Sequence, residues 1–310
     1  MTRLLRAVGC AAVLAIVVGA AHAAPARATF IVDRNVKQPT LKVDRRGRAL
    51  VQYTRQNGKQ VNFLAWGAVN GIANEKLATR QTVFDVDYSG GWAIGRPRLW
   101  KRIRDACEPY DGPRLPLFVA GCKAPDGSYW ALQAWVRLAA MRGLPPFKPS
   151  QSAVELHLSH WSGALAVLQV WPNWTYGGTL QGFFGRLTYR GEPVFGRQAS
   201  RFGQYAYIDT YNSIYGAGWK HDAAKALHRR NGAFCYSFVP QYTPAGYPVH
   251  ELRGPGLGQR HRVRASGPGV TPIIEWEGPR LGPYDPVRDA QINAIFDQII
   301  AGDRVCAKER

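Results

Sequence analysis

Short β-forming segments separated by turn residues recur along most of this 310-residue chain. The clearest series lies between Thr40 and Gly71, where three such segments are split by the turn residues Asp44-Arg-Arg-Gly47 and by Asn57-Gly58. Asn-Gly is a strong signal for a type I′ turn, which joins two antiparallel strands. The sequence therefore predicts an antiparallel β-meander within residues 24–75.

The remainder of the chain, residues 76–310, continues this pattern and is expected to form the main β-rich domain. Strands are predicted at residues 82–88, 116–122, 129–137, 154–158, 165–171, 184–189, 205–211, 233–239, 260–266 and 273–277. Residues 130–141 also fit a helix, and periodicity alone leaves that alternative open. Helical spacing predicts short helices at residues 98–106, where Arg98 and Arg102 share one face, and at residues 221–230.

The clearest helix is the C-terminal one. Asp285 can cap its N-terminus, Pro286 suits the first helical position, and Gly302 can end it. The apolar stripe expected to pack on a sheet is Ile292, Ile295, Phe296, Ile299 and Ile300. The fold class is thus mainly β: an antiparallel β-sandwich-like body with a few short helices and a C-terminal helix packed on a sheet. The meander can share the core of the main domain.

Residues 1–23 have the pattern of a secretory signal peptide. Arg3 and Arg6 precede an apolar run that ends at Ala21-His22-Ala23, a small-x-small exit that predicts cleavage after Ala23. No later stretch is apolar for the roughly 18 residues that a membrane helix needs. We therefore expect a secreted protein without a transmembrane segment after cleavage.

Four cysteines remain after removal of Cys10: Cys107, Cys122, Cys235 and Cys306. In an oxidising compartment an even number of thiols usually forms disulfides, and of the three possible pairings we expect Cys107–Cys122 and Cys235–Cys306. No closely spaced cysteine pair of the zinc-binding type is present. The sequence indicates no metal and no cofactor.

The chain is strongly basic. Its 40 Lys and Arg against 21 Asp and Glu give a net charge of +19, and loss of Arg3 and Arg6 with the signal peptide leaves +17. Such a charge attracts anionic partners over long range. Arg260, Arg262 and Arg264 alternate along a predicted strand, which places three guanidinium groups on one face. They predict an anion-binding face, although a charged edge strand that deters aggregation has the same pattern.

Aromatic residues offer a second candidate binding feature. The chain has ten tryptophans, and Trp171, Trp174 and Tyr176 lie in one turn-rich segment after a predicted strand. Indole rings of this kind either stack on sugar rings or fold back to seal a core. We name these three residues as candidate stacking residues.

Candidate catalytic groups are few. Glu275 and Glu277 flank Trp276 and would share one strand face about 7 Å apart, a spacing admissible for a glycoside hydrolase, with Asp209 as a further candidate acid. A solvated strand face gives the same pattern. No G-x-S-x-G motif is present, and the glycine-rich loops are broken by proline.

Two further pairs could suggest metal binding. His157 and His160 lie three apart in a segment with strand periodicity, so we expect them on opposite faces, His157 at the surface and His160 at the start of a loop. Asp85 and Asp87 supply only two of the oxygen ligands that calcium requires. Neither pair predicts a metal site.

The segments from Cys122 to Trp135 and from Glu155 to Gly163 resemble a family of secreted bacterial proteins of unassigned function, and the resemblance extends over most of residues 85–280. It implies an exported β-rich domain and carries over no activity or site.

Together these features predict a secreted, non-catalytic β-rich protein that binds an anionic or carbohydrate polymer of the cell envelope. A structural or protein-binding envelope component and a secreted glycan hydrolase are the alternatives. Nucleic-acid binding fits the basic charge, but no recognised module accompanies it.

Overall fold

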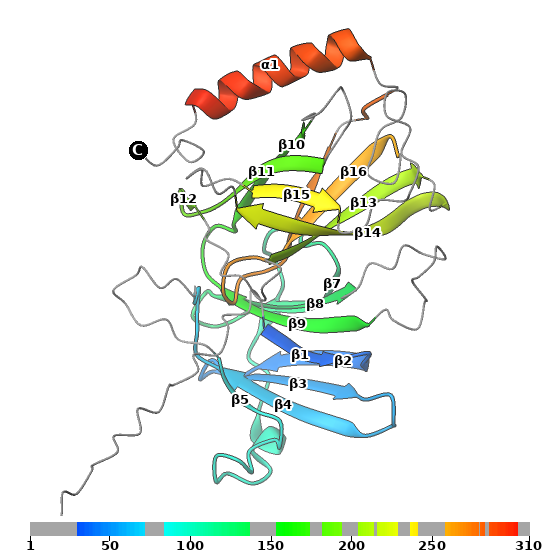
Figure 1. The fold of residues 1–310 in the computed structure, drawn as a ribbon. Helices are drawn as coiled ribbons and strands as arrows, with labels where there is room; N and C mark the ends of the chain where they lie inside the picture. Colours follow the sequence, from blue (N-terminus) through cyan, green and yellow to red (C-terminus); the bar gives the residue numbers. More distant parts are fainter. Residues whose placement is uncertain are drawn as a thin grey trace, which may run out of the picture.

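The computed structural model describes residues 30–71, 84–136, 153–173, 182–193, 204–213, 216–228, 236–240, 258–278, 280–282 and 285–302. The predicted signal peptide lies outside these residues. Within them the chain forms three antiparallel sheets and one C-terminal α-helix, which confirms the mainly β fold class (Figure 1).

The first sheet is the predicted meander. Its strands, in spatial order, are β2 (Lys37–Val43), β3 (Ala49–Thr54), β4 (Gln60–Trp66) and β5 (Asp85–Asp87). The turn at Asn57-Gly58 joins β3 to β4, but it is not of the predicted type I′, which requires positive φ at both residues: Gly58 has φ 81°, whereas Asn57 does not have a positive φ. The turn closes where Gly58 N donates to Arg55 O at 2.9 Å. Local turn chemistry thus sets the register of this sheet.

The second sheet contains, in spatial order, β1 (Phe30–Arg34), β9 (Val154–Trp161), β8 (Tyr129–Val136), β7 (Phe118–Lys123) and β6 (Glu108–Pro109). The strands predicted at residues 116–122 and 129–137 are therefore present as the hairpin of β7 and β8, joined by a turn in which Gly127 N donates to Ala124 O. The alternative helix is wrong over residues 130–136, and residues 137–141 lie outside the described part of the chain.

These two sheets share one hydrophobic cluster. Val51 and Phe63 of the meander and Trp130, Leu156 and Leu158 of the second sheet are buried together in it. The cluster therefore draws on both sides of residue 75, where the sequence suggested a boundary between the meander and the main domain.

The third sheet is the largest. Its strands, in spatial order, are β10 (Val167–Asn173), β11 (Gly182–Tyr189), β15 (Tyr236–Pro240), β14 (Gly216–His228), β13 (Gln204–Ser213), β16 (Arg260–Ala265) and β17 (Ile274–Glu277), with β12 (Glu192–Pro193) beside β11. Its buried face is apolar and includes Leu168, Phe183, Ile208 and Val263.

The helix predicted at residues 221–230 is wrong over residues 221–228, because these belong to β14, and residues 229–230 lie outside the described part of the chain. This segment is rich in alanine, which favours a helix locally. It lies between β13 and β15, and antiparallel pairing with both strands satisfies its backbone groups on either side. Long-range pairing therefore overrides local propensity here.

The helix predicted at residues 98–106 is much shorter, a single 3₁₀ turn at Leu99–Arg102. The next residue, Ile103, is extended with φ −66° and ψ 117°, which ends the turn. Leu99 and Ile103 nevertheless pack together on Leu50 and Leu64, on the face of the meander away from the second sheet. The turn therefore covers one side of the meander.

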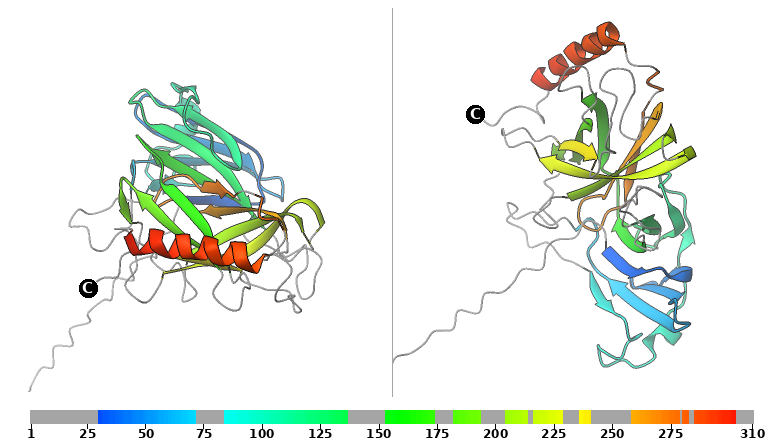
Figure 2. Two further views of the ribbon diagram at one scale, coloured as in Figure 1. Left: turned by 90° about the horizontal axis from the view of Figure 1, so that it is seen from above. Right: turned by 45° about the vertical axis from the view of Figure 1, so that its right-hand side comes forward.

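The C-terminal helix α1 (Pro286–Gly302) lies beside the third sheet in Figures 1 and 2. Asp285 caps it as predicted, since its Oδ1 accepts hydrogen bonds of 3.0 Å from both Val287 N and Arg288 N. Ile292 and Ile295 are exposed, so these two members of the expected stripe do not pack on the sheet. The side chains of Phe296, Ile299 and Ile300 lie outside the description. No helix in the described ranges is long and apolar enough to cross a membrane.

Candidate anion-binding site

The three predicted arginines of β16 lie on one strand face, but each is bound to a carboxylate. Arg262 Nη2 lies 2.7 Å and Arg264 Nη1 lies 2.9 Å from Oδ2 of the buried Asp209. Arg264 Nε also lies 2.5 Å from Oε2 of Glu275. These arginines therefore have their charge balanced within the sheet.

The outer end of this face is more open. Arg260 pairs with Glu277, and both side chains are roughly two-fifths exposed. Glu275 and Glu277 thus share one strand face, as the alternation predicted, and the structure shows that each also contacts an arginine of β16. Glu275 is, however, half-buried and ion-paired, whereas the sequence suggested that it faces solvent.

The aromatic rings that meet these arginines differ from those expected. The guanidinium of Arg262 lies 4.0 Å from the ring centroid of Trp219, and Arg260 lies 5.5 Å from that of Tyr211. Trp171 lies instead in β10, partly buried and near Phe184. Trp174 and Tyr176 lie outside the described residues. The sequence does not indicate Trp219 and Tyr211 as binding residues, because their contact with β16 depends on strand pairing.

The two histidines of β9 are both buried, so their predicted positions at the surface and in a loop are wrong. His160 Nδ1 lies 3.0 Å from Gly67 O and its Nε2 lies 2.8 Å from Ser128 Oγ. Burial lowers the pKa of His160 to about 4. His157 instead lies 3.3 Å from Glu155. Each histidine thus has a structural role in a different environment.

The aspartate pair of β5 also has a structural explanation. Asp87 is buried and its Oδ1 accepts a hydrogen bond from Ser89 N, while its Oδ2 accepts one from Gly91 N. Asp85 is exposed. Among the described residues, no group of three or more His, Cys, Asp and Glu side chains is arranged to hold a metal ion.

The predicted disulfide between Cys107 and Cys122 is present. Cys122 opposes Pro109 in the pairing of β6 with β7, so the bond joins the segment after the 3₁₀ turn to the second sheet. Cys235 and Cys306 lie outside the described residues, and their pairing stays a prediction.

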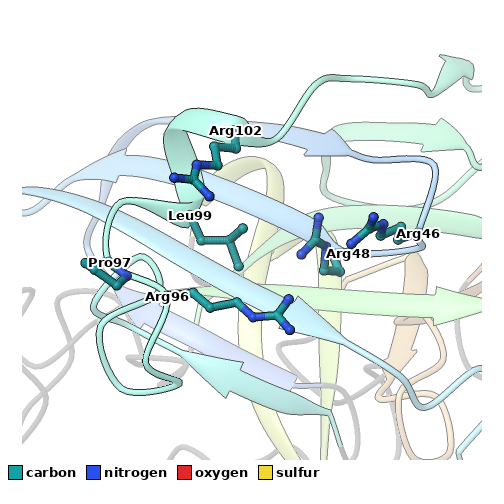
Figure 3. Close-up of a pocket in the computed structure, with 6 residues that line it drawn as sticks. All are labelled: Arg46, Arg48, Arg96, Pro97, Leu99 and Arg102. Carbon is teal, nitrogen blue, oxygen red and sulfur yellow. The ribbon is translucent and has the colours of Figure 1, made fainter.

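A cavity of about 480 Å³ on the meander gathers arginines that the sequence did not single out as a site (Figure 3). It is lined by Arg46, Arg48, Arg96, Pro97, Leu99 and Arg102. Two of these arginines come from the turn between β2 and β3, and two from the segment after β5. Leu99 brings the segments together because it packs on Leu50 and Leu64.

The turn that carries two of these arginines is organised by the buried Asp44. Its Oδ1 accepts hydrogen bonds from Arg46 N at 2.9 Å and Arg48 N at 3.1 Å, and its Oδ2 lies 2.5 Å from Arg48 Nη2. Arg48 is therefore held in an ion pair.

The other three arginines differ from Arg48. Within the described part of the chain, Arg46, Arg96 and Arg102 form no ion pair, and all three are exposed. Planar guanidinium groups bind phosphate and carboxylate through paired N–H donors. The cavity therefore has the chemistry of an anion site.

One sequence signal could have identified this region. Residues 89–104 contain Arg96, Arg98, Lys101, Arg102 and Arg104 and no acidic residue. The contribution of Arg46 could not have been read from that run, because it lies far away in the chain.

Comparison of the chain with protein-family models, with curated proteins and with solved structures finds no match, so the expected resemblance to an exported family stays a prediction.

Proposed function

We propose that this protein is an exported, non-catalytic protein that binds an anionic component of the cell envelope through the arginine cavity. The observation that carries the proposal is the contrast between the arginines of β16, which are bound to carboxylates, and Arg46, Arg96 and Arg102, which form no ion pair within the described residues. Cations that are not balanced by the protein are available to an external anion.

The net charge supports the same function. A chain with 40 basic and 21 acidic residues attracts polyanions over long range, and the cavity offers a place where several guanidinium groups converge. The hydrolase alternative has less support, because Asp209, Glu275 and Glu277 are each engaged by an arginine. A glycoside hydrolase needs one carboxyl group available as an acid and a second available as a nucleophile or base.

The test uses polyphosphate as a soluble anionic probe and dextran as a neutral one, in a salt series. The variant Arg46→Gln/Arg96→Gln/Arg102→Gln is expected to lose most polyphosphate binding. The plot of the logarithm of the association constant against the logarithm of the salt concentration should become less steep, by about 3 at most. The matched control Arg190→Gln/Arg280→Gln/Arg288→Gln removes the same charge from exposed residues outside the cavity.

The control variant is expected to keep most of the affinity. Equal losses in the two triple variants would show that total charge, and not the cavity, governs binding, and would refute the proposal. Binding of dextran comparable to that of polyphosphate would refute it as well.

A further inference from the structure

The loop beside the arginine cavity exposes two large apolar side chains. Trp92 is 69% exposed and Ile94 is 39% exposed, in the segment Ser89–Arg98 that also supplies Arg96 and Pro97 to the cavity. A tryptophan of that exposure leaves a large apolar surface in water. Exposed apolar residues next to a ligand site point to a surface that is covered during function.

The loop is held in this conformation by its own backbone. Arg96 N donates to Gly91 O at 2.8 Å, and Gly95 N donates to Trp92 O at 3.1 Å. Asp87 fixes the entry to the loop through Gly91 N. The exposed position of Trp92 is therefore part of an ordered turn.

Close packing further fixes the base of the loop. Gly91 has φ 118°, and a Cβ atom added there would lie 2.1 Å from Arg96 O. A Cβ atom added at Gly90 would lie 2.6 Å from the side chain of Trp100. The two glycines let the loop turn tightly against the 3₁₀ segment and present its tip outward.

Basic residues follow the apolar tip closely in the chain. Exposed cations on the same segment are Arg96, Arg98, Lys101, Arg102 and Arg104, and Arg46 faces them from the turn between β2 and β3. Residues 89–104 contain no acid. An apolar tip on a basic, acid-free segment beside an arginine cavity matches an anionic lipid surface, because cations attract the headgroups while tryptophan favours the boundary between headgroups and acyl chains.

The position of the loop allows such contact. The segment between β5 and β6, which carries the 3₁₀ turn, forms the end of the molecule opposite α1 in Figure 1 and in the right-hand view of Figure 2. A flat surface can therefore approach this end before it meets the other described elements.

We propose that the Ser89–Arg98 loop and the adjoining arginine cavity dock on an anionic lipid membrane. Trp92 and Ile94 enter the interface, while Arg46, Arg96 and Arg102 bind lipid phosphate groups. This inference rests on the proposed anion-binding function and names its partner. A soluble polyanion would use the arginines and leave both apolar side chains in water, which distinguishes the two partners.

The experiment compares sedimentation with vesicles of equal parts phosphatidylglycerol and phosphatidylcholine, vesicles of phosphatidylcholine alone, and binding of soluble polyphosphate. The wild type is expected to bind the anionic vesicles and polyphosphate. Trp92→Ala/Ile94→Ser is expected to lose about tenfold or more in affinity for anionic vesicles while its affinity for polyphosphate stays within about twofold. The arginine triple variant is expected to lose binding to both the anionic vesicles and polyphosphate.

Insertion can be measured directly. Vesicles with brominated acyl chains should quench tryptophan fluorescence more in the wild type than in Trp92→Phe, because only the wild type has an indole at the tip. Equal quenching in the two proteins, or unchanged vesicle binding by Trp92→Ala/Ile94→Ser, would overturn the membrane inference while polyphosphate binding still supported the proposed function. If the arginine triple variant kept its binding to both vesicles and polyphosphate, the proposed function would instead be overturned.

Discussion

Arg34 Nε lies 2.9 Å from Glu155 Oε1, and this ion pair ties β1 to β9, two strands separated by 119 residues of intervening sequence. The two residues are direct partners in the strand register. Glu155 is buried, and its other oxygen lies 3.3 Å from His157 Nε2. The ion pair adds to the backbone pairing that makes the first described strand part of the second sheet, while Asp33 of the same strand also binds Tyr53 and Arg55 of the meander.

This ion pair gives a first prediction. Burial acts to raise the pKa of Glu155, but hydrogen bonds from His157 and Arg34 outweigh it and hold the pKa below its usual value. A lowered carboxyl pKa contributes stability above the unfolded-state pKa, and that contribution is lost as the pH falls through the folded-state value. Glu155→Gln is expected to cost about 1 kcal/mol at neutral pH, because Arg34 is partly solvated.

The measurement is urea unfolding at several pH values. The cost of Glu155→Gln should shrink on acidification, since the wild-type carboxylate then becomes protonated. Asp111→Asn is the control, because its partner Lys123 forms an exposed pair. A cost that stays constant from neutral pH into the acid range would contradict the assignment.

The buried His160 predicts a second acid-sensitive contribution. Its folded-state pKa of about 4 lies below the ordinary histidine value of 6.5, because burial disfavours the charged ring. The unfolded chain therefore binds a proton first, and stability falls as the pH drops from 6.5 towards 4, by up to about 3 kcal/mol. His160→Gln should flatten this part of the curve. Wild-type and variant curves that stay parallel would show that His160 does not titrate in this way.

The elements that the sequence predicted well are those set by local chemistry. The turn at Asn57-Gly58 and the hairpin turn that ends at Gly127 lie within a few residues of the strands they join, so their signals are readable. The helix prediction over β14 was wrong because the alanines of this segment favour a helix locally, whereas its strand conformation depends on pairing with β13 and β15.

The candidate sites show the same division. Alternation correctly placed Arg260, Arg262 and Arg264 on one face, but Asp209, the partner of the last two, belongs to another strand. The arginine cavity joins the turn at Arg46 to the segment at Arg96, and only the packing of both on the meander brings them together. The basic charge is therefore readable from the sequence, whereas the cations that are available to a ligand are set by long-range packing.

The buried carboxylate of β13 gives a third prediction. Asp209→Asn leaves Arg262 and Arg264 with weaker partners inside the sheet and is expected to destabilise the fold by about 3 kcal/mol. Glu275→Gln should cost about 1 kcal/mol, and the exposed Glu277→Gln less than about 0.5 kcal/mol. Thermal unfolding of the three variants measures the order of these losses in stability. Release of reducing ends from wall polysaccharides by the wild type, abolished by Glu277→Gln, would contradict both this assignment and the non-catalytic proposal.

The disulfide gives a fourth prediction. Cys107 and Cys122 are 15 residues apart, and closing a loop of this length stabilises the fold by about 3 kcal/mol in the chain-entropy model. Replacing both with serine should lower stability by about that amount. Intact-mass measurement before and after reduction should find no free thiol in the processed protein, with Cys235 joined to Cys306. A mapped peptide pair that crosses these two bonds would contradict the predicted pairing.

The tight base of the exposed loop gives the last prediction. In Gly91→Ala the new methyl group would meet Arg96 O, and φ 118° is a conformation that alanine strongly disfavours. The loop must then rearrange, although Trp92 and every arginine of the cavity remain. Binding of anionic vesicles should therefore fall about as far as in Trp92→Ala/Ile94→Ser.

Gly95→Ala is the matched control. Gly95 also has a positive φ, at 67°, but no neighbouring atom lies within 4 Å of its added Cβ. This variant therefore carries only a backbone cost of about 1 kcal/mol. Vesicle affinities measured for the two variants separate loop geometry from side-chain identity, and equal affinities would show that the ordered shape of the loop does not matter for docking.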